Sequence, residues 1–174
     1  MSLGVGVAPG VAPRAAGHVT VEIACALRPL DASHDELLRS LEEQEDVWEF
    51  IGTLPFPPAG SGHHLFAVVA DGVAVGIAGL VRSRALEGED FELLCAIRAE
   101  AQLHGFAQRA CKLALAWAFD TAKLERVIAC IDNDNEAARS IALKLGMKQL
   151  APSPPNRTVY VTYRDERASI TPSP

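Results

Sequence analysis

The stretch from residue 91 to residue 122 constrains the fold most, because a short apolar run leads through a turn with small residues into a long Ala/Leu-rich segment. Residues 91–97 predict a buried strand, and residues 105–122 predict a helix. Small residues at the turn let another molecule approach the backbone closely. The helix N-terminus there presents unpaired N–H groups and a partial positive charge. The sequence therefore predicts an anion site, most naturally for phosphate.

The residues of this turn indicate which of the known phosphate-binding motifs it can match. It has no Gly-Lys-Ser/Thr, which excludes a Walker P-loop, and Gly105 alone cannot supply the three glycines of a dinucleotide fingerprint. Residues 102–107 instead match Gln/Arg-x-x-Gly-x-Gly/Ala. This pattern resembles the pyrophosphate loop of the GNAT superfamily of acetyl-CoA-dependent N-acetyltransferases. An ordinary strand-to-helix turn is the alternative.

A second motif supports the resemblance. Residues 135–147 follow an apolar strand pattern at 126–131; they open with Asn135 and end in Gly146, with Met147 in the place of the family's Phe. Both motifs occur in the family's order. The chain is identified as a GNAT member over residues 19–164, and it is most similar to the branch that acetylates ribosomal-protein N-termini.

The resemblance implies acetyl-CoA as cosubstrate. Backbone amides of the 102–107 loop would bind the pyrophosphate, and His104 stands where relatives often carry Lys or Arg. The family holds the pantetheine arm in a gap beside the strand that precedes the loop. Asn135 would contact the pantetheine or the acceptor, and it also suits a helix N-cap. The expected cofactor-binding residues are Ile97, Arg98, Gln102, Leu103, His104, Gly105, Phe106, Ala107 and Asn135.

The catalytic residues implied by the resemblance are Glu92 and Asn135. Glu92 aligns with an acidic residue that would accept the amine proton, often through water; a surface Glu at a strand end is the alternative. Relatives commonly carry Ser and Tyr as general acids where this chain has Ala138 and Ala142. A thiolate leaving group scarcely needs an acid, so we expect catalysis without one. A CoA-binding GNAT module that lacks catalysis, as a sensor or subunit, is the alternative function.

The acceptor side is less specific. In the family a helix-loop region roofs the acceptor site, and Trp48, Phe50 and Phe56 could line it, with core packing as the alternative for each. The acceptor is expected to be a primary amine, on a protein N-terminus or a small molecule. A second copy of the chain is a further candidate partner.

Composition limits the remaining choices. The chain has 174 residues and a formal net charge of −6, which predicts one domain and argues against a nucleic-acid partner, since that needs a basic face. No apolar run approaches the ~20 residues of a membrane span. The four cysteines form no C-x-x-C pair and lie in apolar surroundings, which predicts buried thiols, no metal and a cytoplasmic location.

The pattern predicts an α/β (α+β) fold, a mixed and mostly antiparallel sheet with helices on both faces, as in the GNAT acyltransferase fold. Asp71-Gly72 predicts a hairpin turn, and the adjacent His63 and His64 are assigned to a loop. Pro29 is expected to close the first strand. We expect a flexible arm at 1–17, the acetyltransferase domain at 18–167 and a disordered tail at 168–174. Expected strands are 19–27, 65–70, 73–81, 91–97, 126–131, 148–150 and 158–163, with helices from 31, at 47–51, at 105–122 and at 135–146.

Overall fold

The computed structural model describes residues 24–51, 62–86, 88–150 and 155–167. The arm expected at 1–17 and the tail expected at 168–174 lie outside these residues. In chain order the elements are β1 (Cys25–Pro29), η1 (Ala32–His34), α1 (Asp35–Glu42), α2 (Glu45–Phe50), β2 (His64–Ala70), β3 (Val73–Ser83), β4 (Asp90–Ile97), η2 (Ala99–Ala101), α3 (Phe106–Asp120), β5 (Arg126–Asp132), α4 (Glu136–Lys144), β6 (Lys148–Leu150), β7 (Arg157–Tyr163) and α5 (Arg164–Arg167).

The described strands form one seven-stranded sheet in the order β1-β2-β3-β4-β5-β7-β6. Every neighbouring pair is antiparallel except β4 and β5, which are parallel. The expected mixed, mostly antiparallel sheet is therefore confirmed. The parallel pair arises because α3 carries the chain back across the sheet between β4 and β5, as a parallel connection requires.

The predicted β2–β3 hairpin is confirmed. Ala70 pairs with Val73, and the two turn residues both have positive φ, 48° at Asp71 and 79° at Gly72. That is the type I′ geometry, which matches the twist of the flanking strands. The turn sets the β2–β3 register at Ala70 and Val73, and an irregularity between Val68 and Val69 shifts it further along.

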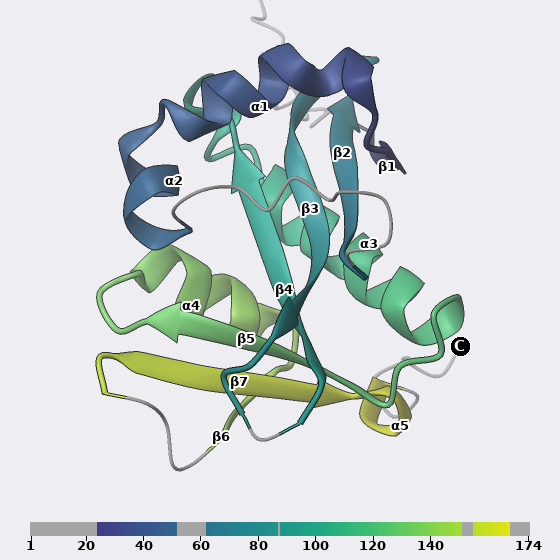
Figure 1. Cartoon of the computed structure of the whole chain (residues 1–174), viewed down its shortest axis with the longest axis vertical. Coiled ribbons are helices and arrows are strands. Elements are labelled where there is room, and N and C mark those ends of the chain that lie inside the picture. Colours follow the sequence, from purple (N-terminus) through teal and green to yellow (C-terminus); the bar gives the residue numbers. More distant parts are fainter. Residues whose placement is uncertain (1–23, 52–61, 87, 151–154, 168–174) are drawn as a thin grey trace, which may run out of the picture.

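Helices cover both faces of the sheet, as predicted. On one face, Leu37, Leu38, Leu41 and Val47 of α1 and α2 pack against Ile77 and Ala96. On the other, apolar residues of α3 pack against alternate residues of β3 and β5, Leu80 and Val127 among them. Figure 1 shows α3 crossing the sheet on the far side from the viewer, while α1 lies across the top of the view and α2 at the left. The alternation of side chains along each strand makes this two-sided core possible.

Two expectations about the first strands need correction. β1 extends two residues beyond the expected end at Leu27, and Pro29 pairs with Phe66. Proline is tolerated there because β1 is an edge strand, where the missing N–H costs no ladder hydrogen bond. The part of the expected strand at 19–23 lies outside the described residues.

His64 is also not a loop residue: it begins β2. Its ring lies 4.8 Å from the ring of Trp117 and 5.7 Å from that of Phe91, centroid to centroid. Burial is the largest cause that lowers the pKa of His64, with the charges of Arg82 and His63 adding to it. His64 therefore occupies the first position of β2, with its ring packed among aromatic side chains. The sequence did not indicate this, because two adjacent histidines look like part of a polar loop.

The cysteines differ in burial from what was expected. Cys111 is buried, while Cys25, Cys95 and Cys130 are half-buried, and all four are free thiols. Burial raises the pKa of the Cys25 and Cys130 thiols, so both favour the protonated form. They are packing residues of the sheet.

Candidate active site

The site begins where the two parallel strands separate. Glu92 and Ile128 are the register pair of β4 and β5, and no further pair follows in the described residues, although β4 continues to Ile97 and β5 to Asp132. Figure 1 shows the two strands pointing in different directions beyond this contact. The sheet is therefore open between their carboxyl ends, and both edges present backbone to the opening.

The loop that follows β4 has an unusual backbone. Gly105 has φ 76°, the left-handed region that glycine adopts without strain. Leu103 has φ 64° and its side chain is fully exposed. A bulky residue in this conformation is an outlier, and such strain clusters at ligand sites. The result is a tight turn that directs backbone N–H groups outward at the start of α3.

These N–H groups lack acceptors. Arg109 N–H donates to Gly105 O at 3.2 Å, the first bond of α3. The six preceding amides, at residues 103–108, donate to no group in the described part of the chain. Charge adds to them: the Arg109 guanidinium lies 5.0 Å from the Phe106 ring centroid and donates to His104 O at 2.9 Å. His104 Nδ1–H in turn donates to Gln102 O at 2.7 Å.

Two further observations test whether a phosphate-bearing ligand fits here. A Cβ placed on Gly105 would meet no protein atom within 4 Å, so the loop faces open space. Arg98 Nε is buried and has no hydrogen-bond partner among the described residues, and a buried donor of this kind costs free energy until it finds an acceptor. Open amides and an unused guanidinium donor suit the phosphates of CoA.

The backbone at the end of β4 is already partly used. Ile97 O accepts hydrogen bonds from the side-chain amides of Gln44 at 3.2 Å and Gln102 at 3.1 Å. Arg98 N–H donates to Val75 O at 2.8 Å. Any contact of pantetheine with these two residues would therefore involve groups other than the Ile97 carbonyl and the Arg98 N–H. Sequence reasoning missed Gln44, because nothing in its own stretch indicates a partner so far along the chain.

Glu92 lies at the point where the strands part. Its carboxylate accepts a hydrogen bond from Ser83 Oγ at 2.8 Å and from the Cys130 N–H at 3.3 Å. The side chain thus bridges three strands and meets β5 where the backbone pairing ends. The carboxylate raises the pKa of the Cys130 thiol further, after burial. Glu92 is half-buried and fixed, unlike a freely solvated surface residue.

Asn135 is the N-cap of α4. Its Oδ1 accepts from the Ala138 N–H at 3.0 Å, and its own N–H donates to Asp132 O at 3.0 Å. Ala142 is 3% exposed and packs in one cluster with Tyr160 and Met147. The capping role of Asn135 is therefore observed, and its amide nitrogen is the group left for a ligand.

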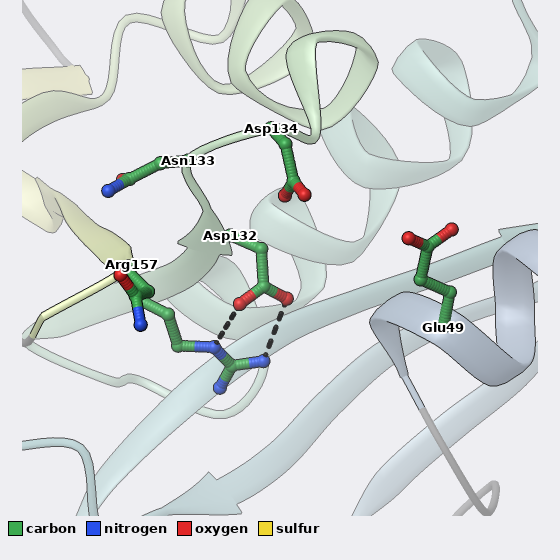
Figure 2. Close-up of a pocket in the computed structure, with 6 residues that line it drawn as sticks. Glu49, Asp132, Asn133, Asp134 and Arg157 are labelled. Carbon is green, nitrogen blue, oxygen red and sulfur yellow. Dashed lines mark hydrogen bonds and ion pairs between the residues drawn. The ribbon is translucent and has the colours of Figure 1, made fainter.

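A pocket of about 550 Å³ lies at the carboxyl end of β5, where it is lined by α2, the β5–α4 connection and the start of β7. Figure 2 shows Glu49 of α2 across the pocket from Asp134 and from the Asp132–Arg157 pair. Arg157 donates to Asp132 through Nε at 2.7 Å and Nη2 at 3.1 Å, which lowers the pKa of Asp132 and raises that of Arg157. Glu49 and Asp134 have no such cation in the described residues. The pocket is therefore net negative.

The expected acceptor-side aromatics are not placed. Phe56 and the side chains of Trp48 and Phe50 lie outside the described residues, although the backbone at 48 and 50 belongs to α2. In the described part of the chain, no group of three or more His, Cys, Asp or Glu side chains could hold a metal ion. None of the described helices is long and apolar enough to cross a membrane.

Comparison with known proteins identifies the fold. A family model described as an acetyltransferase (GNAT) domain matches residues 25–148. Solved structures with the same fold include an acetyltransferase from Agrobacterium tumefaciens str. C58 (17% identity, TM-score 0.64, 88% of this chain and 99% of that one) and a GNAT-family acetyltransferase from Bacillus anthracis (19%, 0.65, 81% and 95%). Mutant forms of the spermidine/spermine N-acetyltransferase SpeG from Vibrio cholerae are similar too (14%, 0.64, 83% and 96%). The comparison with curated proteins found no match.

Proposed function

The chain belongs to the GNAT acetyltransferase family, and from that premise we propose that it transfers the acetyl group of acetyl-CoA to a primary amine by direct attack in a complex that holds both substrates. The observation that carries the proposal is the run of six unpartnered amides at residues 103–108. A helix N-terminus with open amides favours phosphate. The run lies on the loop that follows β4, the strand that bounds the opening.

The residues proposed to hold acetyl-CoA are those expected from the sequence, and the structure suggests which group of each residue would make the contact. The loop from Gln102 to Ala107 holds the pyrophosphate through its amides, and the charge of Arg109 favours the phosphates further. Arg98 contributes its unpartnered Nε, and Asn135 its amide nitrogen. When bound, acetyl-CoA supplies an activated acetyl group as a thioester.

The amine step is assigned to Glu92 and the acidic pocket. An amine arrives protonated at neutral pH, and Glu49 and Asp134 attract that cation. Before attack the amine must lose a proton, which Glu92 accepts directly or through water. The amine nitrogen then bonds to the acetyl carbon while the carbon–sulfur bond breaks; the nitrogen gives its remaining extra proton to water, and the departing thiolate takes up a proton from water. Ala138 and Ala142 supply no acid, and a thiolate needs little help to leave.

The acidic pocket favours an acceptor with more than one positive charge. The Vibrio cholerae neighbour is named for spermidine and spermine, which are amines of that kind; a protein N-terminus, as in the ribosomal-protein branch, is the alternative acceptor. A cytoplasmic location and a homodimer stay predictions from the sequence.

The test mixes the protein with acetyl-CoA and a panel of amines and measures free-thiol release. We expect release that depends on the amine, and binding of CoA by calorimetry. CoA binding without release for any amine would favour the CoA-binding module that the two alanines suggest. No CoA binding at millimolar concentration would refute the proposal altogether.

A further inference from the structure

We propose that Gln44 is a positioning residue for the cofactor loop, which it ties to the helix pair on the acceptor side. This inference rests on the proposed function, because it concerns how the same site is held. Gln44 lies in the link between α1 and α2, where its N–H donates to Leu41 O at 3.1 Å. It is half-buried and its whole side-chain amide is used.

The side-chain amide of Gln44 hydrogen-bonds to the backbone on both sides of Arg98. Its Nε2 donates to Ile97 O at 3.2 Å, and its Oε1 accepts from the Ala99 N–H at 2.7 Å. A primary amide is the one common side chain that offers a donor and an acceptor at this spacing. Gln44 therefore closes a two-bond bridge to the segment in which the strand turns into the loop.

A second contact extends the bridge to the loop itself. Gln102 Nε2 donates to Asp46 Oδ2 at 2.9 Å and to the same Ile97 O at 3.1 Å. Residues 44 and 46 thus hold residues 97, 99 and 102, which stand on both sides of Arg98 in the chain and precede the open amides. The loop has a strained residue, Leu103, immediately after Gln102, and strained backbone persists only where the surroundings determine it.

The bridge also joins the two halves of the site. α2 begins one residue after Gln44 and carries Glu49 into the acidic pocket. A shift of α2 when an acceptor binds would reach the loop through Gln44 and Asp46, which bond to residues 97, 99 and 102. Positioning by Gln44 therefore predicts that acceptor and CoA affect each other's affinity, and by the same factor in both directions.

The experiment compares CoA binding by calorimetry for the parent and for Gln44→Ala, with Glu43→Ala as the matched control on the adjacent exposed residue. Loss of two hydrogen bonds should weaken CoA binding roughly tenfold and raise the KM for acetyl-CoA by the same factor. We expect kcat at saturating acetyl-CoA to change less than threefold. Gln44→Glu keeps an acceptor for the Ala99 N–H but sets a carboxylate oxygen against Ile97 O and Asp46 Oδ1, so it should weaken CoA binding at least as much as Gln44→Ala.

Asp46→Ala gives a second measurement that does not depend on a half-buried residue, since Asp46 is exposed. It should weaken CoA binding by a few fold, because Gln102 keeps its bond to Ile97 O. If the parent binds CoA and Gln44→Ala binds it equally well, the inference is overturned and the proposed function stands. If the parent binds no CoA, both are overturned.

Discussion

Gly105→Val should weaken acetyl-CoA binding roughly 100-fold or more while the protein still folds. Gly105 has φ 76°, and a Cβ there would meet no protein atom within 4 Å. The cost to folding is therefore that of the left-handed conformation alone, about 1–2 kcal/mol. The branched side chain would stand in the open space that the unpartnered amides of residues 103–108 face.

The expected loss of affinity follows from the hydrogen bonds that would be blocked. A bond from an amide to a charged phosphate contributes about 1.5–3 kcal/mol. Loss of two such bonds weakens binding by about 3 kcal/mol or more, which is a loss of roughly 100-fold or more in affinity. Stability and binding should thus change by separable amounts.

Gly72→Val is the matched control. Gly72 has φ 79° and equally open surroundings, but it lies in the β2–β3 turn. Both variants should melt roughly 2–8 °C below the parent, and CoA at 100 times the parent's Kd should stabilise the parent and Gly72→Val by ~2.7 kcal/mol. Only Gly105→Val should lose that stabilisation in a thermal melt. Unchanged CoA affinity in folded Gly105→Val would refute the assignment of the loop.

Three further outcomes are expected. Glu92→Gln should lower turnover by ~100-fold at pH 7 and by less at high pH, where the amine loses its proton unaided; a pH–rate profile identical to the parent's would remove Glu92 from the mechanism. His64→Phe should flatten the acid side of the stability curve. The folded pKa of His64 lies below the unfolded ~6.5, so its neutral form is favoured by folding and stability falls as the pH drops through 6.5 and then through the folded value. Urea melts of the parent and of His64→Phe at pH 7.5 and 5 test this. If both proteins lose the same free energy of unfolding between these pH values, the prediction is contradicted. Arg126→Ala should lower the free energy of unfolding by about 3 kcal/mol, because it leaves the carboxylate of Asp90, which is 5% exposed, without its ion-pair partner. This value is at the low end for buried ion pairs, since the Arg126 side chain is itself 37% exposed. A melting temperature within 2 °C of the parent's would contradict that estimate.

Elements with a strong local signal were predictable from the sequence. The Asp71-Gly72 turn, the strand before the loop and α4, which ends at Lys144 shortly before Gly146 with φ 77°, all follow from residues near one another in the chain. The turn at Gly105, with φ 76°, belongs to the same class, while binding of phosphate by the loop at 102–107 stays a prediction. Local pattern was also sufficient for Asn135, whose capping bond spans three residues.

Contacts between distant segments could not be predicted in this way. Gln44 and Ala99 are 55 residues apart, and Glu92 and Cys130 are 38 apart. Nothing in the periodicity near either member of these pairs specifies the other, since a glutamine after a helix or a glutamate in a strand is satisfied by water in most settings. The aromatic cluster around His64 was missed for the same reason, because Trp117 approaches it from α3.

The two proposed substrates would be recognised by different parts of the chain, one by backbone and the other by side chains. In the proposed function the loop would bind acetyl-CoA through consecutive backbone amides, which side-chain substitution leaves in place provided that glycine stays at 105. The lining of the acidic pocket instead comes from α2, the end of β5, the β5–α4 connection and the start of β7, and none of these lining residues hydrogen-bonds to the loop in the described part of the chain. Charge substitutions at Glu49 and Asp134 should therefore alter the choice of acceptor and spare the affinity for acetyl-CoA. Gln44 is the exception, because it is a side chain on the acceptor side that bonds to the backbone on the cofactor side.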